Sequence, residues 1–299
     1  MSDESDDTGA PDNVDDASTQ PGGTSDASAL KGMLSFFTLI HLDITERDME
    51  SMDSRFHLVP IIGSLFGLFT WIVVTLVMFL DQGFGMGTSI MAGVFCLAVA
   101  YIGSKFLHFD GLTDFGDGMI VSGPPEKHVH ALKDSLVGAG GIGVALTVIL
   151  LSVCIYASMP LEVMVMVVPM TEVFLKFAMV VAAAFGIPGH GMAGRQVEMT
   201  TKSSIFEALL ISIVLCVVLF LLGMLTFEML DIYMLPGWGD LAFMLLVGFI
   251  MSTVVGVIMA HIANKNFGMV NGDILGATNE VTRPVVMFAL ALLLMISWW

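Results

Sequence analysis

Three aspartates lie close together directly after a long apolar run, at positions 110, 114 and 117. On a continuous helix their spacing puts Asp110, Asp114 and Asp117 on one face. Carboxylates held so close together repel one another, and a bound cation removes that conflict. Ligation by oxygen alone favours Mg²⁺ or Mn²⁺ over zinc. The spacing therefore predicts a metal site made by these three residues, with Mg²⁺ as the expected cofactor.

The residues around the aspartates fit a phosphorylated ligand. Gly111 and Gly118 leave the backbone bare, so we expect them to let a bulky ligand come close. His108, at the front of the segment, is a candidate for phosphate contact or proton transfer. A merely solvated acidic loop is the alternative, but Leu112 and Phe115 lie in the same stretch and require cover.

A second polar cluster precedes the third long apolar run. It contains Lys133, Asp134, Ser135 and Gly138. Asp134 or Ser135 could cap the helix that follows, and the N-terminus of that helix would then attract an anion. Capping alone would also explain these residue types. We take Asp134 as a candidate general base and the other three as candidate substrate-binding residues.

A third cluster lies near the C-terminal end and resembles the first in composition. Asp273 and Glu280 are again seven residues apart, and Gly272 and Gly276 keep the intervening surface bare. Both acidic residues are candidate general bases, alongside Asp134. The two glycines are candidate substrate-binding residues.

One lysine falls inside an apolar run. Lys176 follows Glu172 by four residues, so the two side chains could neutralise each other on a single helix. The other interpretation is that both face a catalytic cavity, where Lys176 would contact a phosphate. The sequence leaves both open.

The elements that must position these residues are membrane helices. Of the 299 residues, 56% are hydrophobic and 13% are charged, about half the charged fraction of a soluble domain. We predict an all-α, polytopic bundle of about seven transmembrane helices, preceded by a short interfacial or re-entrant helix at 33–40. The expected spans are 58–80, 86–107, 137–159, 161–187, 204–230, 241–262 and 284–299.

The charge pattern predicts the organisation of the chain around this bundle. Residues 1–30 form an expected disordered acidic tail, and residues 31–299 form the expected transmembrane catalytic domain. Nearly all Lys and Arg residues fall in the N-terminal region and in the loops 108–136, 188–203 and 263–283. The positive-inside rule therefore predicts a multi-pass protein of the cell membrane with its N-terminus and active site in the cytoplasm.

The same composition bounds the partners. The chain has no basic stripe, so nucleic acid is excluded as an expected partner. We expect contact with the lipid bilayer and with small-molecule substrates, and the sequence leaves a homo-oligomer open. A cation-coupled transporter is a competing class, but it would place carboxylates in the middle of spans, whereas nearly all lie at one predicted surface.

Taken together, the three clusters resemble the cobalamin synthase family, the adenosylcobinamide-GDP ribazoletransferases. The resemblance covers about residues 33–299 and implies a Mg²⁺-dependent membrane transferase. Such an enzyme joins adenosylcobinamide-GDP to α-ribazole, or to its 5′-phosphate, and releases GMP. The matching residues are His108, Asp110, Gly111, Leu112, Asp114, Asp117 and Gly118, then Asp134, Ser135 and Gly138, then Gly272, Asp273, Gly276, Ala277 and Glu280.

A rival within the enzymes shares part of the first cluster. Asp114, Asp117 and Gly118 are similar to the start of the CDP-alcohol phosphotransferase signature. That family displaces a nucleotide from a pyrophosphate with an alcohol, which is the same reaction class. The rest of its signature is not spaced here as that family requires, which argues against phospholipid synthesis.

Overall fold

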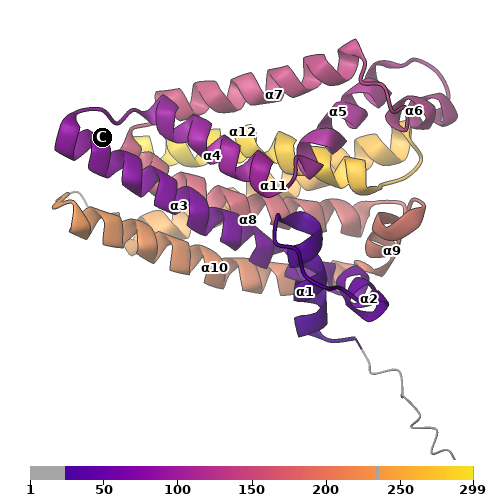
Figure 1. Ribbon diagram of the computed structural model, residues 1–299, viewed down its shortest axis with the longest axis horizontal. Coiled ribbons are helices and arrows are strands. Elements are labelled where there is room, and N and C mark those ends of the chain that lie inside the picture. The colour runs from indigo at the N-terminus through magenta and orange to yellow at the C-terminus, as the bar shows by residue number, and fades with distance from the viewer. Residues whose placement is uncertain (1–23, 234–235, 299) are drawn as a thin grey trace, which may run out of the picture.

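The long helices lie side by side along the longest axis of the molecule (Figure 1). The computed structural model describes residues 24–233 and 236–298, and within these ranges the chain is helical, with one isolated β-bridge, Pro188 to Val270. The predicted all-α class is confirmed. Six helices are long and apolar enough to cross a membrane. They are α3 (Val59–Phe84), α7 (Ala139–Ser158), α8 (Leu161–Phe185), α10 (Lys202–Met229), α11 (Trp238–Asn266) and α12 (Gly272–Trp298).

The second predicted span, 86–107, corresponds to a helix that ends at a sharp bend. Helix α4 (Ser89–Gly103) is followed after three residues by α5 (Leu107–Ile120), and the two are bent by 89°. Lys105 and Phe106 at the bend are left-handed, with φ of 54° and 58°, which costs about 1–2 kcal/mol per residue. The backbone N–H of Phe106 donates to the carbonyl of Tyr101 at 2.7 Å. The bend turns α5, with its aspartates, away from the direction of α4.

The last helix begins twelve residues earlier than predicted. The expected span 284–299 starts at a proline, yet α12 begins at Gly272 and contains Pro284 in its interior. Charged residues before the proline made this segment resemble a loop. Glu280 and Arg283 are instead buried among partners, which hydropathy cannot detect. The third cluster therefore lies on the first turns of a helix rather than in a loop.

The short helices gather at one end of the bundle, at the right in Figure 1. Helix α1 packs against α2, α2 against α9, and α5 against α6. Residues 1–23 of the predicted tail lie outside the described residues, and α1 already begins at Asp26, inside the predicted tail. The predicted helix at 33–40 ends at Phe37 as part of α1. The bounds are α1 (Asp26–Phe37), α2 (Glu46–Ser54), η1 (Phe56–Leu58), α6 (Pro125–Leu132) and α9 (Gly191–Met199).

Helix α8 is the centre of the bundle. It packs against α3, α10, α11 and α12, and every residue from 163 to 183 is buried. Gly63 and Gly67 of α3, the small-xxx-small pair, lie against the backbone carbonyls of Glu172 and Pro169. Because neighbouring helices enclose α8, its two interior charged residues are surrounded by protein.

Candidate active site

Carboxylates from two helices meet at the end of the bundle where the short helices gather, which we call the polar end. Asp110 and Asp114 lie on α5, and Asp273 lies in the first turn of α12. The side chain of Asp114 feels the charges of Asp110, Asp117 and Asp273. Asp110 is exposed, and the other three are half-buried. We call these four residues the acidic cluster. The aspartates of the first motif lie on one continuous helix, which is the condition under which their spacing gives a single face, although residues 108–136 were expected to form a loop.

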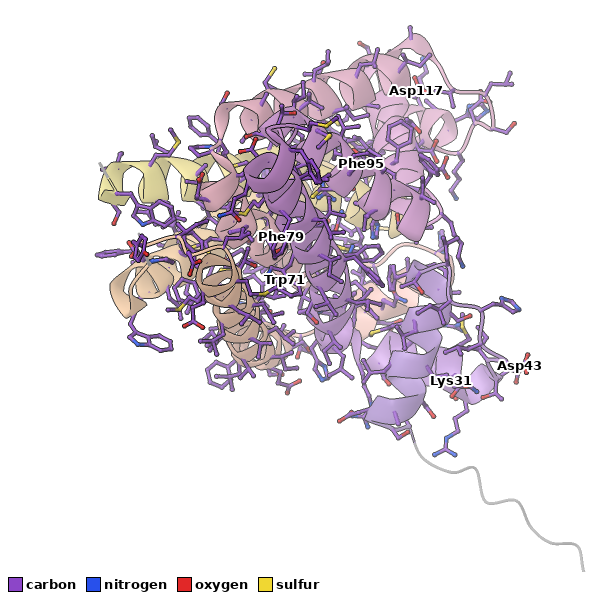
Figure 2. All side chains as sticks on the ribbon, turned by 60° about the vertical axis from the view of Figure 1, so that its left-hand side comes forward. Lys31, Asp43, Trp71, Phe79, Phe95 and Asp117 are labelled. Carbon is purple, nitrogen blue, oxygen red and sulfur yellow. The ribbon has the colours of Figure 1, made fainter. Side chains whose placement is uncertain are left out.

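Asp117 also holds the start of another helix. Its two carboxylate oxygens accept the backbone N–H groups of Gly138 at 2.6 Å and Gly141 at 2.8 Å. Asp117 therefore satisfies the first turn of α7, a role predicted for Asp134 or Ser135. Asp134 instead accepts the backbone N–H of Leu136 at 3.0 Å and closes a local turn. Figure 2 shows Asp117 toward the same side of the molecule as Lys31 and Asp43, which lie in and after α1.

The acidic cluster offers oxygen donors alone. Across residues 24–233 and 236–298, no group of three His, Cys, Asp or Glu side chains is close enough to hold a metal ion. Mg²⁺ commonly takes one or two carboxylates and completes its shell with water and substrate phosphates. Such a donor set fits Asp110 and Asp114, with Asp117 beside them. The three-aspartate metal site stays a prediction.

Gly111, Gly118 and Gly276 serve helix packing, so the expectation of a bare surface at these three positions was wrong. A Cβ on Gly111 would lie 2.8 Å from the carbonyl oxygen of Asp273, and one on Gly276 would lie 3.2 Å from the Cα of His108. Gly118 faces an aromatic ring at the end of α11. Helices α5 and α12 therefore cross with their backbones in near contact.

Other candidate residues remain open to solvent beside the acidic cluster. Lys133, Asp134 and Ser135 are exposed between α6 and α7, and Gly272 is exposed at the start of α12. Lys133 lies within electrostatic range of Asp273. Gly138 is the N-cap of α7 and half-buried. A ligand at this end of the bundle can therefore meet a cation and a polar loop next to the carboxylates.

Beneath the acidic cluster, Lys176 joins three helices. Its Nζ lies 2.5 Å from Nε2 of His108 on α5 and donates to Oδ1 of Asn279 on α12 at 2.7 Å. The Nδ2 of Asn279 donates to Glu280 Oε1 at 2.9 Å. Lys176 lies within electrostatic range of Glu172 on its own helix but forms no hydrogen bond with it. The side chain is 1% exposed, so it does not reach the surface where a phosphate was expected to bind.

The partner of Glu172 is Arg283, which forms an ion pair with it across α8 and α12. The Nε of Arg283 also lies 3.5 Å from Oε2 of Glu280, and the hydroxyl of Tyr101 donates to the same oxygen at 3.1 Å. Two carboxylates thus face two basic side chains, Arg283 and Lys176, so the formal charges balance. We call these seven residues the buried network: Tyr101, His108, Glu172, Lys176, Asn279, Glu280 and Arg283.

The buried network includes two predicted catalytic residues that solvent cannot reach. His108 is 4% exposed and Glu280 is 1% exposed. Glu280 was expected in a loop, but it lies in the third turn of α12 with Arg283 and Tyr101 as partners. These side chains lie beneath the site and support it, whereas the sequence analysis placed them on its surface. The sequence held two signals for this network, the i, i+4 spacing of Glu172 and Lys176 and the i, i+3 spacing of Glu280 and Arg283.

These features define a polytopic helical membrane protein with an acidic cluster at one end and a charge-balanced network beneath it. The family model described as cobalamin-5-phosphate synthase matches residues 29–291. The chain belongs to that family. No solved structure is significantly similar to it.

Named relatives cover nearly the whole chain. The adenosylcobinamide-GDP ribazoletransferase of Methanocella arvoryzae is 28% identical over 263 residues, which is 86% of this chain and 92% of the relative. The protein of that name from Methanococcoides burtonii is 26% identical over 277 residues, 88% of this chain and 91% of the relative. The one from Pyrococcus furiosus is 27% identical over 263 residues, 87% and 98% respectively. All three names describe a transferase.

Proposed function

We propose that this protein is the transferase for which its relatives are named. It would join adenosylcobinamide-GDP to α-ribazole, or to α-ribazole 5′-phosphate, and release GMP. The observation that carries the proposal is the meeting of α5 and α12. Two motifs far apart in the sequence supply Asp110, Asp114 and Asp273 to one acidic cluster at the end of a membrane bundle.

The acidic cluster is the proposed site for Mg²⁺, held by Asp110 and Asp114 with Asp117 beside them. When bound, the ion would offset the negative charge of the pyrophosphate that the acceptor attacks. Asp117 orients its carboxylate by accepting two backbone N–H groups of the α7 N-terminus. The same hydrogen bonds fix the start of α7 next to α5.

The exposed residues around the cluster have complementary roles. Lys133 would contact a phosphate of the nucleotide-bearing substrate, because its charge lies near Asp273 at the open end of the bundle. Asp273 and Asp134 are the two solvent-accessible candidates for the base that accepts the proton of the acceptor hydroxyl. Asp273 is oriented by the side-chain amide of Asn271, which donates to its Oδ2 at 2.8 Å.

The two other functions considered from the sequence gain no support. A cation-coupled transporter requires intramembrane carboxylates that can bind and release an ion. The carboxylates of Glu172 and Glu280 are instead paired with Arg283 and are about 98% buried. The family match and the named relatives do not support a CDP-alcohol phosphotransferase.

The orientation in the membrane is also a proposal. The polar end of the bundle carries α2, α5, α6 and α9 and most of the basic residues (Figure 1). The positive-inside rule places this end, and with it the acidic cluster, in the cytoplasm of a cell whose membrane the protein spans.

One assay tests the proposed reaction. The purified full-length protein is incubated with adenosylcobinamide-GDP, α-ribazole or its 5′-phosphate, and Mg²⁺, and GMP is measured. We expect GMP and the joined corrinoid in equal amounts, and loss of both when EDTA removes the metal. GMP release without either acceptor, or no release with both, would contradict the proposal.

A further inference from the structure

We propose that Lys176 is a positioning residue for the acidic cluster. By joining His108 of α5 to Asn279 of α12, it fixes the crossing at which Asp110 and Asp114 face Asp273. The proposal deepens the proposed function and rests on it for its catalytic consequence. The geometric part stands on the contacts of Lys176 alone.

Charge repulsion acts to separate α5 from α12, so a contact that holds the two helices together stabilises their crossing. The carboxylates of Asp110 and Asp114 on one helix and of Asp273 on the other lie within electrostatic range. Like charges repel across this contact. At the same crossing, Gly111 and Gly276 bring the two backbones almost into contact, so a small separation of the helices removes many short contacts at once.

Lys176 is placed to oppose that separation. His108 lies one turn before the Gly111 contact on α5, and Asn279 lies one turn after Gly276 on α12. Lys176 reaches both from the buried central helix α8 with contacts of 2.5 and 2.7 Å. The ring of Phe37 stacks on His108 at 5.8 Å between centroids and covers it on another side.

Burial excludes a direct role for this lysine at the substrate. Lys176 is 1% exposed, and both of the groups it contacts are themselves buried. Glu172, one turn away on α8, is already paired with Arg283. The ammonium group therefore acts on the acidic cluster through His108 and Asn279. Removing a residue that hydrogen-bonds directly to a metal ligand typically lowers metal affinity 10- to 100-fold. Lys176 acts one contact further from the ligands, so the lower end of that range applies.

The test compares Lys176→Met with the wild-type full-length protein. Amide hydrogen exchange is measured by mass spectrometry, and Mn²⁺ binding is measured by electron paramagnetic resonance as a probe for Mg²⁺. We expect exchange in residues 107–120 to become about tenfold faster while α3 and α10 stay unchanged. We expect Mn²⁺ affinity to fall about 10-fold.

Thr171→Val is the matched control. Thr171 is also fully buried on α8, but its hydroxyl donates only to the carbonyl of Val167 on the same helix. We expect this variant to keep wild-type exchange in α5 and wild-type Mn²⁺ affinity. If Lys176→Met does not fold, His108→Phe removes the same contact from the α5 side and keeps a ring for Phe37 to stack on.

The outcomes separate the two proposals. A folded Lys176→Met with wild-type exchange in α5 and wild-type Mn²⁺ affinity overturns the positioning role. Faster exchange spread evenly over the whole bundle overturns it as well, because that marks a general loss of stability. If the wild type releases no GMP, the proposed function fails, and the exchange in α5 alone then decides the role of Lys176.

Discussion

Asp114 is the residue on which the proposed chemistry depends most, since the other three carboxylates of the acidic cluster all lie within electrostatic range of it. Asp114→Asn keeps the size of the side chain and removes its charge. We expect transferase activity to fall at least about 100-fold, because a metal ion contributes several kcal/mol to such a transition state. GMP release measures the activity, and circular dichroism checks that the helices remain.

Asp81→Asn is the control for this loss. Asp81 is an exposed aspartate near the end of α3, at the opposite end of the bundle. We expect activity within twofold of wild type, about 0.4 kcal/mol. Equal losses in both variants would show that the effect of Asp114→Asn is not specific to the acidic cluster.

Arg283 has a structural role that predicts a large effect on stability. Arg283→Met leaves the carboxylates of Glu172 and Glu280 buried without their shared cation. Removing one partner from a buried ion pair typically costs about 3–5 kcal/mol. We expect a loss of this size in denaturant unfolding of the purified protein in detergent. Lys265→Met, at an exposed basic residue in the last turn of α11, should change stability by less than about 0.5 kcal/mol.

At this scale the sequence was informative where neighbours in the chain are also neighbours in space. The spacing of Asp110, Asp114 and Asp117 predicted one helical face, and α5 has it. The partner of Glu172 could not be predicted, because Arg283 is 111 residues away and only tertiary packing brings it close. A local i, i+4 rule offered Lys176 instead, which lies within electrostatic range of Glu172 but does not form its ion pair.

The close crossing of α5 and α12 predicts that replacing a glycine with alanine destabilises the protein at the crossing but not at an exposed position. Gly111→Ala places a methyl group 2.8 Å from the carbonyl oxygen of Asp273. We expect a destabilisation of about 1–3 kcal/mol, the usual cost of overpacking, and loss of most activity as α5 moves away from α12. Thermal unfolding and GMP release measure the two effects.

Gly143→Ala provides the comparison. Gly143 is exposed on α7, and a Cβ there meets nothing within 4 Å. Alanine in a helix interior is more favourable than glycine by up to about 1 kcal/mol. We therefore expect unchanged or slightly raised stability and full activity. A Gly111→Ala variant that behaves like Gly143→Ala would contradict the close crossing.

Hydropathy predicted the positions of most long helices, but it missed the bend that follows α4 and the early start of α12. Six of the seven expected spans agree with α3, α4, α7, α8, α10 and α11 to within about five residues at each end. The bend after α4 depends on left-handed Lys105 and Phe106, residue types that carry no turn signal. The early start of α12 depends on buried partners for Glu280 and Arg283, and a single-sequence scale scores such residues as exposed.

The proposed orientation of the bundle in the membrane predicts which residues can be labelled from each side. Glu126 is exposed on α6 at the polar end, and Gly83 is exposed near the end of α3 at the other end. The labelling uses a Cys154→Ser background, which removes the exposed native cysteine. A membrane-impermeant maleimide is applied to inverted and to right-side-out membrane vesicles. We expect Glu126→Cys to react in inverted vesicles and Gly83→Cys in right-side-out vesicles. The reverse pattern would place the acidic cluster outside the cell.

The burial of α8 has a consequence for how the protein is made. During translation α8 leaves the ribosome well before α12, so Glu172 enters the bilayer while its cationic partner has not yet been synthesised. A charged residue at the centre of a newly inserted helix costs about 2.5–3.5 kcal/mol. Insertion of α8 is therefore provisional until the last helix arrives. A chain stopped after Asn266 should be degraded in pulse-chase experiments much faster than the complete one.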